Sequence, residues 1–252
     1  MNETSSRWIR RFHQVGDARV RLICLPHAGG SATAYFPFSR AAVAAGLDAD
    51  VVAVQYPGRQ DRRAERCYDD VGEMADAIAE DLGPWSDRPL ALFGHSMGAT
   101  VGYEVARRLE ARGADLLGLF ASACRAPSQQ RIEYVHQRDD DGLIAALKEL
   151  SGTDSAVLGD DELLRMVLPA VRGDYTAVET YRHDGGPELA CPIQVLVGDT
   201  DPVTDLAEAA AWRAHTRSAC AVEVFPGGHF YLNDRLDAVL TTVAARLHEW
   251  LG

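Results

Sequence analysis

The sequence predicts an α/β protein with a mostly parallel, doubly wound sheet and a helical insertion. Two observations support this fold class: six short apolar runs recur along the chain, and helical patterns separate most of them. The runs are almost continuous in Val, Ile, Leu and Phe, which is typical of strands covered on both faces. The 252 residues, of which 47% are hydrophobic, suffice for one large core, so we expect a single domain over residues 1–252.

The expected strands and helices follow each other in a regular order. The strands are residues 20–25, 51–54, 90–93, 116–121, 193–197 and 222–225. The helical patterns of the main body are residues 31–45, 70–82, 97–112, 206–215 and 236–250. In the third of these, Val101, Val105 and Leu109 recur at a spacing of four, which gives the helix one apolar face.

One long segment breaks the alternation. Between residues 125 and 186 we find no convincing strand, but helical patterns near 141–150, 160–171 and 174–182. Insertions into α/β sheets usually lie beyond the carboxyl ends of the strands, where ligands bind. We therefore interpret this segment as a helical lid over the site; the alternative is an excursion that only packs on the body.

Composition excludes several classes of function. A net charge of −12 disfavours nonspecific binding to nucleic acid. The sequence contains no run of 18 apolar residues, so we expect no membrane span. Its polar first residues lack the apolar region of a signal peptide, so we expect a cytoplasmic protein. The five cysteines form no C-x-x-C pair, so we expect no disulfide framework and no metal site. We also expect no cofactor. The absence of an obvious association helix favours a monomer.

The pentapeptide Gly94-His95-Ser96-Met97-Gly98 lies between a predicted strand and a predicted helix. That is the context of a G-x-S-x-G nucleophile elbow, a tight turn that exposes the serine hydroxyl. The free N–H groups at the start of the helix favour negative charge near that oxygen. Alone, the pattern is weak, because it also describes an ordinary strand-to-helix turn.

A serine nucleophile needs a base that takes its proton and an acid that orients the base. In α/β-hydrolases these partners follow in the order Ser, acid, His. Asp201 comes after the strand 193–197 and is our candidate acid; Asp199 and Asp205 are competitors, and Asp199 could instead stabilise a turn. His229 comes after the strand 222–225 and is our candidate base.

The α/β-hydrolase pattern also predicts two backbone N–H groups that stabilise the oxyanion. One is the backbone N–H of Met97, the residue after the nucleophile, and the other is the N–H of Ala28 in the small-residue loop 25–30. His27 precedes this loop donor, which suggests a structural role for that histidine. The sequence thus predicts an α/β-hydrolase that transfers an acyl group to Ser96.

The chain also resembles the type II thioesterases, the discrete editing hydrolases of polyketide and nonribosomal peptide assembly lines. The resemblance covers nearly the whole length, and its specific motifs include Leu25-Pro26-His27-Ala28-Gly29-Gly30-Ser31, Tyr56-Pro57-Gly58-Arg59-Gln60-Asp61-Arg62, Phe93-Gly94-His95-Ser96-Met97-Gly98-Ala99, Leu168-Pro169-Ala170-Val171-Arg172-Gly173-Asp174-Tyr175 and Gly227-Gly228-His229-Phe230-Tyr231. It departs from the family at Gln60, where glycine is common.

The resemblance implies a substrate and a site. It places the triad on Ser96, Asp201 and His229, and the oxyanion donors on Ala28 and Met97. It implies hydrolysis of acyl thioesters on the phosphopantetheine arm of an acyl or peptidyl carrier protein, which removes stalled or misprimed acyl groups.

A short basic stretch is the candidate contact for such a carrier. Because carriers tend to be acidic, a chain at −12 needs a local basic patch to attract them. Arg59, Arg62, Arg63 and Arg66 are candidates to meet the arm's phosphate or the carrier's acidic helix. The alternative is a solvated loop face.

Two other functions stay open. A small-molecule carboxylesterase or an acyltransferase could use the same triad. In a different class, the chain could be a non-catalytic carrier-binding module on a hydrolase fold, which would not react with an active-site probe.

Overall fold

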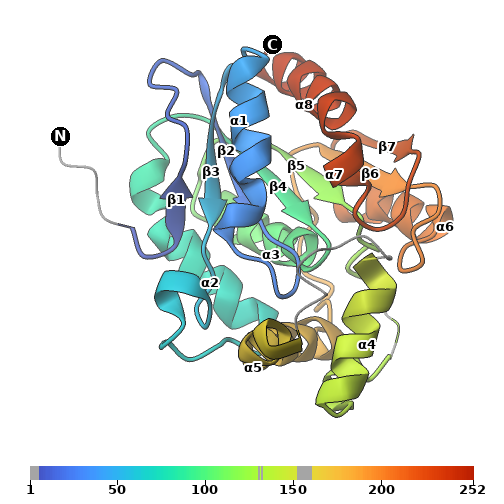
Figure 1. Ribbon diagram of the computed structural model, residues 1–252. Coiled ribbons are helices and arrows are strands. Elements are labelled where there is room, and N and C mark those ends of the chain that lie inside the picture. The colour runs from blue at the N-terminus through green and yellow to red at the C-terminus, as the bar shows by residue number, and fades with distance from the viewer. Residues whose placement is uncertain (1–5, 130, 132, 152–160) are drawn as a thin grey trace.

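The computed structural model describes residues 6–129, 131, 133–151 and 161–252. A seven-stranded sheet lies at its centre (Figure 1). Its strands are β1 (Ile9–Arg11), β2 (Val20–Leu25), β3 (Ala49–Val54), β4 (Leu90–His95), β5 (Leu116–Ser122), β6 (Ile193–Gly198) and β7 (Cys220–Phe225). They lie in the order β1-β3-β2-β4-β5-β6-β7. β1 runs antiparallel to β3 and the other pairs are parallel, so the predicted fold class is confirmed.

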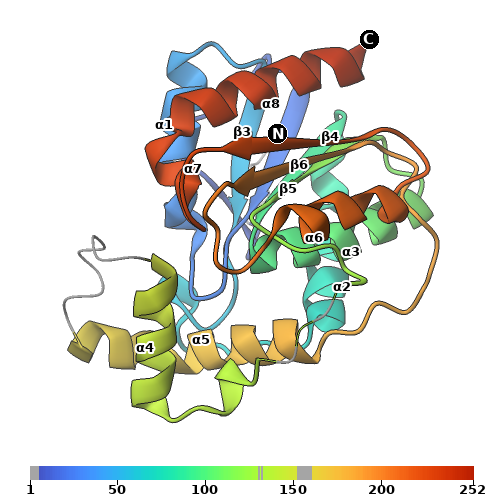
Figure 2. The same ribbon diagram turned by 90° about the vertical axis from the view of Figure 1, so that its right-hand side faces the viewer.

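Helices cover both faces of this sheet (Figure 2). α1 (Phe36–Ala44) and α8 (Leu236–Leu251) pack on one face, and the short α7 (Tyr231–Asp234) leads into α8. α2 (Val71–Asp81), α3 (Met97–Ala111) and α6 (Leu206–Ala210) pack on the other. Every residue of β2, β3, β4 and β6 is buried, which explains why these strands read as continuous apolar runs.

Two strand differences from the sequence prediction have a physical reason. The prediction missed β1, because three residues at the edge of a sheet carry too little apolar periodicity to be recognised. β3 begins at Ala49, two residues before the predicted start, and includes the charged Asp50. Its carboxylate is buried because Arg11 and Arg21 donate to it, at 2.7 and 3.3 Å.

The insertion holds two long helices, α4 (Asp140–Ser151) and α5 (Asp161–Thr180). They lie together at the end of the molecule opposite the C-terminus (Figures 1 and 2). The prediction of separate helices at 160–171 and 174–182 was wrong, because α5 continues through Pro169 and Gly173. Gly173 serves packing: a Cβ there would lie 2.9 Å from the Tyr68 carbonyl oxygen.

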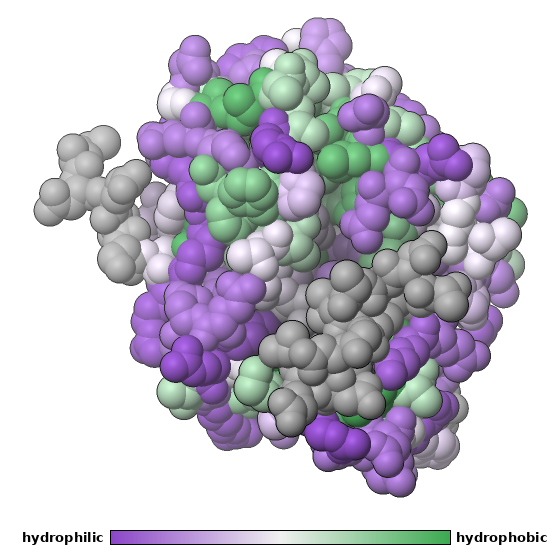
Figure 3. Space-filling view, viewed as in Figure 1, coloured by the Kyte–Doolittle hydropathy of each residue, from purple (hydrophilic) through white to green (hydrophobic). Residues whose placement is uncertain are grey.

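The described helices include none that is long and apolar enough to cross a membrane. On the face shown in Figure 3, hydrophilic residues surround smaller groups of hydrophobic ones.

Candidate active site

Strand β4 delivers Ser96 to the start of α3 through a strained turn. Ser96 has φ 55° and ψ −123°, a conformation that L-residues rarely adopt outside functional turns. Two backbone hydrogen bonds hold it: Ser96 N donates to Ser122 O, and Ala99 N donates to Ser96 O, each at 2.8 Å. The turn presents the hydroxyl at the N-terminus of α3, as a nucleophile elbow requires.

The two glycines of the elbow are sterically required. A Cβ on Gly94 would lie 2.1 Å from the Gly98 carbonyl oxygen, and one on Gly98 would lie 2.0 Å from the Leu25 carbonyl oxygen. Both obstacles are backbone atoms, which cannot turn aside. The spacing of the motif therefore follows from the close approach of β4, α3 and the loop after β2.

The loops after β6 and β7 bring Asp201 and His229 together. His229 Nδ1 lies 3.0 Å from Asp201 Oδ2 and 3.1 Å from Oδ1, and both side chains are buried. Val203 N also donates to Asp201 Oδ1, at 2.8 Å, which fixes the carboxylate. An Nδ1–H that donates to Asp201 leaves Nε2 as a lone-pair acceptor. Among the described residues, this buried Nε2 has no hydrogen-bond partner.

The competing aspartates have other partners. Asp199 Oδ1 accepts from Gly227 N at 2.9 Å and so stabilises the loop that carries His229. Asp205 caps α6: its side chain accepts from Glu208 N, and the Glu208 side chain accepts from Asp205 N. Of the three acids, Asp201 is the one whose carboxylate contacts His229.

Ala28 and Met97, the expected oxyanion donors, line the same cavity as Ser96 and His229. Met97 is the first residue of α3, so its N–H has no partner within the helix. The hydrogen bonds found among the described residues leave both N–H groups unused.

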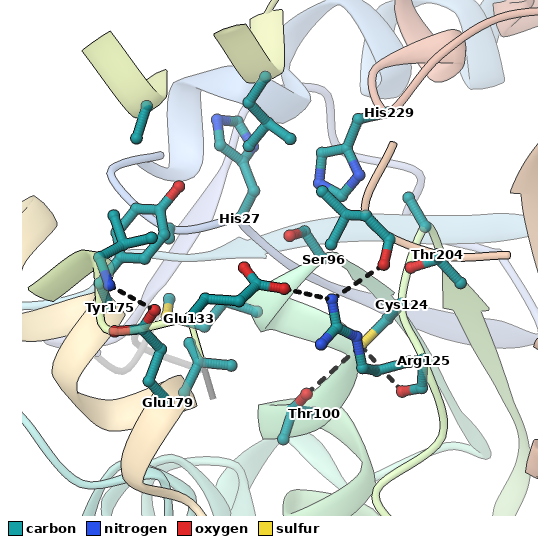
Figure 4. Close-up of a pocket in the computed structure, with 18 of the residues that line it drawn as sticks. His27, Ser96, Thr100, Cys124, Arg125, Glu133, Tyr175, Glu179, Thr204 and His229 are labelled. Carbon is teal, nitrogen blue, oxygen red and sulfur yellow. Dashed lines mark hydrogen bonds and ion pairs between the residues drawn. The ribbon is translucent and has the colours of Figure 1, made fainter. Parts of the chain in front are cut away.

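The cavity has a volume of about 590 Å³, and Ser96 and His229 both face it (Figure 4). α4 and α5 provide much of its apolar wall: Ala146, Leu147, Val167, Val171, Tyr175 and Val178. Arg125 and Glu133, paired at 3.0 Å, form a polar part of the lining. The site is therefore lined by the sheet's loops on one side and by α4 and α5 on the other.

Two further histidines lie beside His229. Burial and the neighbouring His229 and Arg59 lower the pKa of His27 to about 4. Burial, followed by His229 and His27, also lowers the pKa of His95 well below its usual value. His95 Nδ1 pairs with Ser122 Oγ at 2.9 Å. Both rings are neutral near pH 7 and pack around the base.

Comparison with known proteins identifies the family. A sequence model of the thioesterase domain matches residues 20–247. The chain belongs to the thioesterase family.

Individual relatives show which kind of thioesterase the chain resembles. The chain is 52% identical over 247 residues to a probable cadicidin biosynthesis thioesterase of Streptomyces griseus, covering 98% of this chain and 68% of the relative. It is 47% identical to thioesterase PikA5 of Streptomyces venezuelae, covering 98% and 88%. The solved type II thioesterase BorB of the borrelidin biosynthetic cluster matches with a TM-score of 0.91 and 49% identity over 98% and 100% of the two chains. The resemblance to type II thioesterases is thus confirmed, and with it the α/β-hydrolase fold and hydrolase activity.

The structure corrects part of the predicted basic patch of this thioesterase. Arg59 is 5% exposed and makes a two-bond ion pair with Asp174, at 2.7 and 2.8 Å. Arg62 is 6% exposed, pairs with Glu65 and lies 4.5 Å from the Trp8 ring centroid. The prediction that these two form a surface for a carrier was wrong, because both side chains are buried and each guanidinium is paired with a carboxylate of this protein.

The other residues of that stretch are placed differently. Arg63 and Arg66 are exposed, and Arg66 lies 3.5 Å from Asp69. Gln60, where the family often has glycine, has φ 50°, the left-handed conformation that glycine adopts most easily. Its Nε2 donates to the hydroxyls of Ser31 and Thr33, each at 2.8 Å, which stabilises the turn without glycine.

Several residues of the thioesterase cavity were not predicted. Cys124 and Arg125 follow β5, and Tyr175 and Glu179 come from α5. Cys124 and Arg125 could have been predicted from their position directly after a parallel strand, because ligands bind at the carboxyl ends of such strands. Burial raises the pKa of the Cys124 thiol to about 11, so this cysteine is not a competing nucleophile.

Proposed function

We propose that this thioesterase hydrolyses acyl thioesters on the phosphopantetheine arm of an acyl or peptidyl carrier protein, and so removes stalled or misprimed acyl groups. The observation that carries the proposal is the buried His229–Asp201 pair, whose His229 lines the same cavity as the Ser96 elbow. The relatives support the substrate class, since their names place them in cadicidin biosynthesis, in the borrelidin biosynthetic cluster and, for the type II thioesterase YbtT, in the yersiniabactin NRPS/PKS pathway.

The proposed reaction has two halves. Ser96 Oγ attacks the thioester carbon while His229 Nε2 accepts the hydroxyl proton, and the N–H groups of Ala28 and Met97 stabilise the oxyanion. His229 then gives the proton to the departing thiolate. In the second half, His229 activates a water that attacks the acyl-enzyme, and Ser96 leaves with the returned proton. Asp201 holds the imidazole and stabilises its cation.

The cavity supports a substrate that enters as a long arm. At about 590 Å³ it lies within the usual size range of small-molecule pockets. We infer that residues 125–186 act as a lid on a single domain, since α4 and α5 supply its apolar wall. Arg63, which is exposed, remains our candidate contact for an acidic carrier.

A fluorophosphonate probe tests the assignment of the nucleophile. We expect it to modify Ser96 in the native protein, and we expect Ser96→Ala to lose both labelling and turnover of an acyl-pantetheine thioester. The matched control is Ser128→Ala, because Ser128 is an exposed serine next to the cavity. Labelling of another residue, or turnover by Ser96→Ala, would overturn the assignment. A folded wild-type protein that does not label would favour a binding module.

A further inference from the structure

The loop that carries Ala28 is held by the lid helix α5. Asp174, on α5, is fully buried, and its Oδ2 accepts from Gly29 N at 2.7 Å. Arg59 donates to both oxygens of Asp174, at 2.7 and 2.8 Å, and also to Gly30 O at 2.9 Å. Asp174 thus holds the peptide that joins Ala28 to Gly29, and Arg59 holds the carbonyl of Gly30.

Packing at this contact is tight. Gly29 has φ +75°, and a Cβ there would lie 2.9 Å from Val171 Cγ2, one turn before Asp174 on α5. The loop therefore leans directly on the helix. A displacement of this part of α5 would break the buried ion pair and release the loop at the same time.

We propose that Asp174 is a positioning residue for the oxyanion hole. Its bond to Gly29 N fixes the peptide next to Ala28, and so keeps the Ala28 N–H directed at the thioester oxygen. The paired Arg59 neutralises the carboxylate, which would otherwise repel the developing oxyanion. The Asp174 region of α5 is accordingly part of the catalytic frame. The inference rests on the proposed function, because it takes Ala28 as an oxyanion donor.

Two double variants separate positioning from stability. Arg59→Met/Asp174→Asn removes both charges and keeps an oxygen that can accept from Gly29 N. Arg59→Met/Asp174→Leu has nearly the same shape and no such oxygen. Replacing a buried ion pair by neutral residues of similar size is often tolerated, so we expect similar thermal midpoints.

We expect the two doubles to differ in kcat. Loss of one oxyanion donor costs about 10²–10³-fold, and a misplaced donor should cost part of that. On an acyl-pantetheine thioester we expect the Asn double to stay within about 3-fold of wild type and the Leu double to lose about 10–100-fold in kcat, with KM nearly unchanged.

A pair of inhibitors provides a readout that a merely structural role would not move. A trifluoromethyl ketone analogue forms a tetrahedral adduct that uses the oxyanion hole, whereas a thioether analogue has no carbonyl at the reacting position. We expect the Leu double to bind the ketone more weakly in proportion to its loss in kcat/KM, and the thioether as well as wild type does. Equal kcat in the two doubles, or equal weakening of both inhibitors, would overturn the proposal.

Controls keep the test interpretable. Asp50→Asn changes another buried aspartate paired with arginines, at the amino end of β3, and should lower the thermal midpoint without changing kcat. If the Leu double does not fold, Arg59→Met/Asp174→Met is the second acceptor-free variant. A wild-type protein that labels at Ser96 but does not cleave the thioester would contradict the proposed function rather than the role of Asp174.

Discussion

At the residue scale, backbone contacts explain why the nucleophile motif has its spacing. Gly94 and Gly98 leave no space for a Cβ, and Ser96 occupies a strained conformation between them. Strain of this kind costs about 1–3 kcal/mol and persists only where the surroundings impose it. Here the bonds of Ser96 to Ser122 and Ala99 impose it.

Replacing Asp201 tests the assignment of the acid. We expect Asp201→Asn to lower kcat by about 10³–10⁴-fold, because the amide no longer selects the Nδ1–H tautomer or stabilises the imidazolium. The fold should survive, since Asn is isosteric. The measurement is kcat on an acyl-pantetheine thioester, with the thermal midpoint recorded in parallel.

The competing acids provide the controls. Asp199→Asn weakens one turn bond, and Asp205→Asn alters a helix cap, so each should keep kcat within a few-fold of wild type. A loss at Asp199→Asn as large as that at Asp201→Asn would contradict the assignment.

The sequence could supply the candidate triad because each member follows a predicted parallel strand or opens a helix. It favoured Asp201 but offered Asp199 as a competitor, since both lie in the same loop, and hydrogen bonding now separates the two. It could not show that Arg59 is buried, because its partner Asp174 lies 115 residues away in the chain. Contacts between residues so far apart leave no local pattern.

At the element scale, the main body was predictable and the lid only in part. Strands such as β2 were recognised because both of their faces are buried. β1 was missed because it is short and lies at the edge of the sheet. α5 was divided in two at Gly173, because glycine is unfavourable inside a helix. Packing of α5 against Tyr68 and against the loop that carries Ala28 overrides that preference here.

The continuity of α5 matters for the site. One helix places Val171 and Tyr175 in the cavity wall and Asp174 against the loop that carries Ala28. Residues three or four positions apart share one helix face, so a break at Gly173 would separate these roles. α5 thus both lines the cavity and holds the loop that carries Ala28.

At the scale of the whole molecule, buried histidines make stability depend on pH. His215 is buried, and its Nε2 pairs with Ser128 Oγ at 2.8 Å. Burial, followed by the nearby His183 and Arg107, lowers the pKa of His215 to about 4. The unfolded chain binds this proton near pH 6.5 and the folded chain does not, so the free energy of unfolding decreases as pH falls from about 6.5 to 4.

Chemical denaturation at several pH values checks this expectation. Each such histidine contributes a slope of up to about 1.4 kcal/mol per pH unit within that window. We expect His215→Gln to flatten the decline relative to wild type, while both proteins show no contribution from this group above about pH 7. Parallel curves for the two proteins would show that His215 does not contribute.

The net charge of −12 also belongs to this scale. It gives no general attraction for an acidic carrier, so the proposed function assigns recognition to the arm, the cavity and local contacts such as Arg63. A substrate joined to its carrier should therefore be distinguished from a free ester by the arm that fills the cavity.

The most direct test compares kcat/KM for one acyl group presented in two ways: as a thioester on a phosphopantetheinylated carrier protein and as a p-nitrophenyl ester. Wild-type protein should favour the carrier thioester despite the better leaving group of the ester, and Ser96→Ala should hydrolyse neither. A clear preference for the oxygen ester, with no release of the acyl group from the carrier by mass spectrometry, would contradict an editing thioesterase and favour a small-molecule esterase.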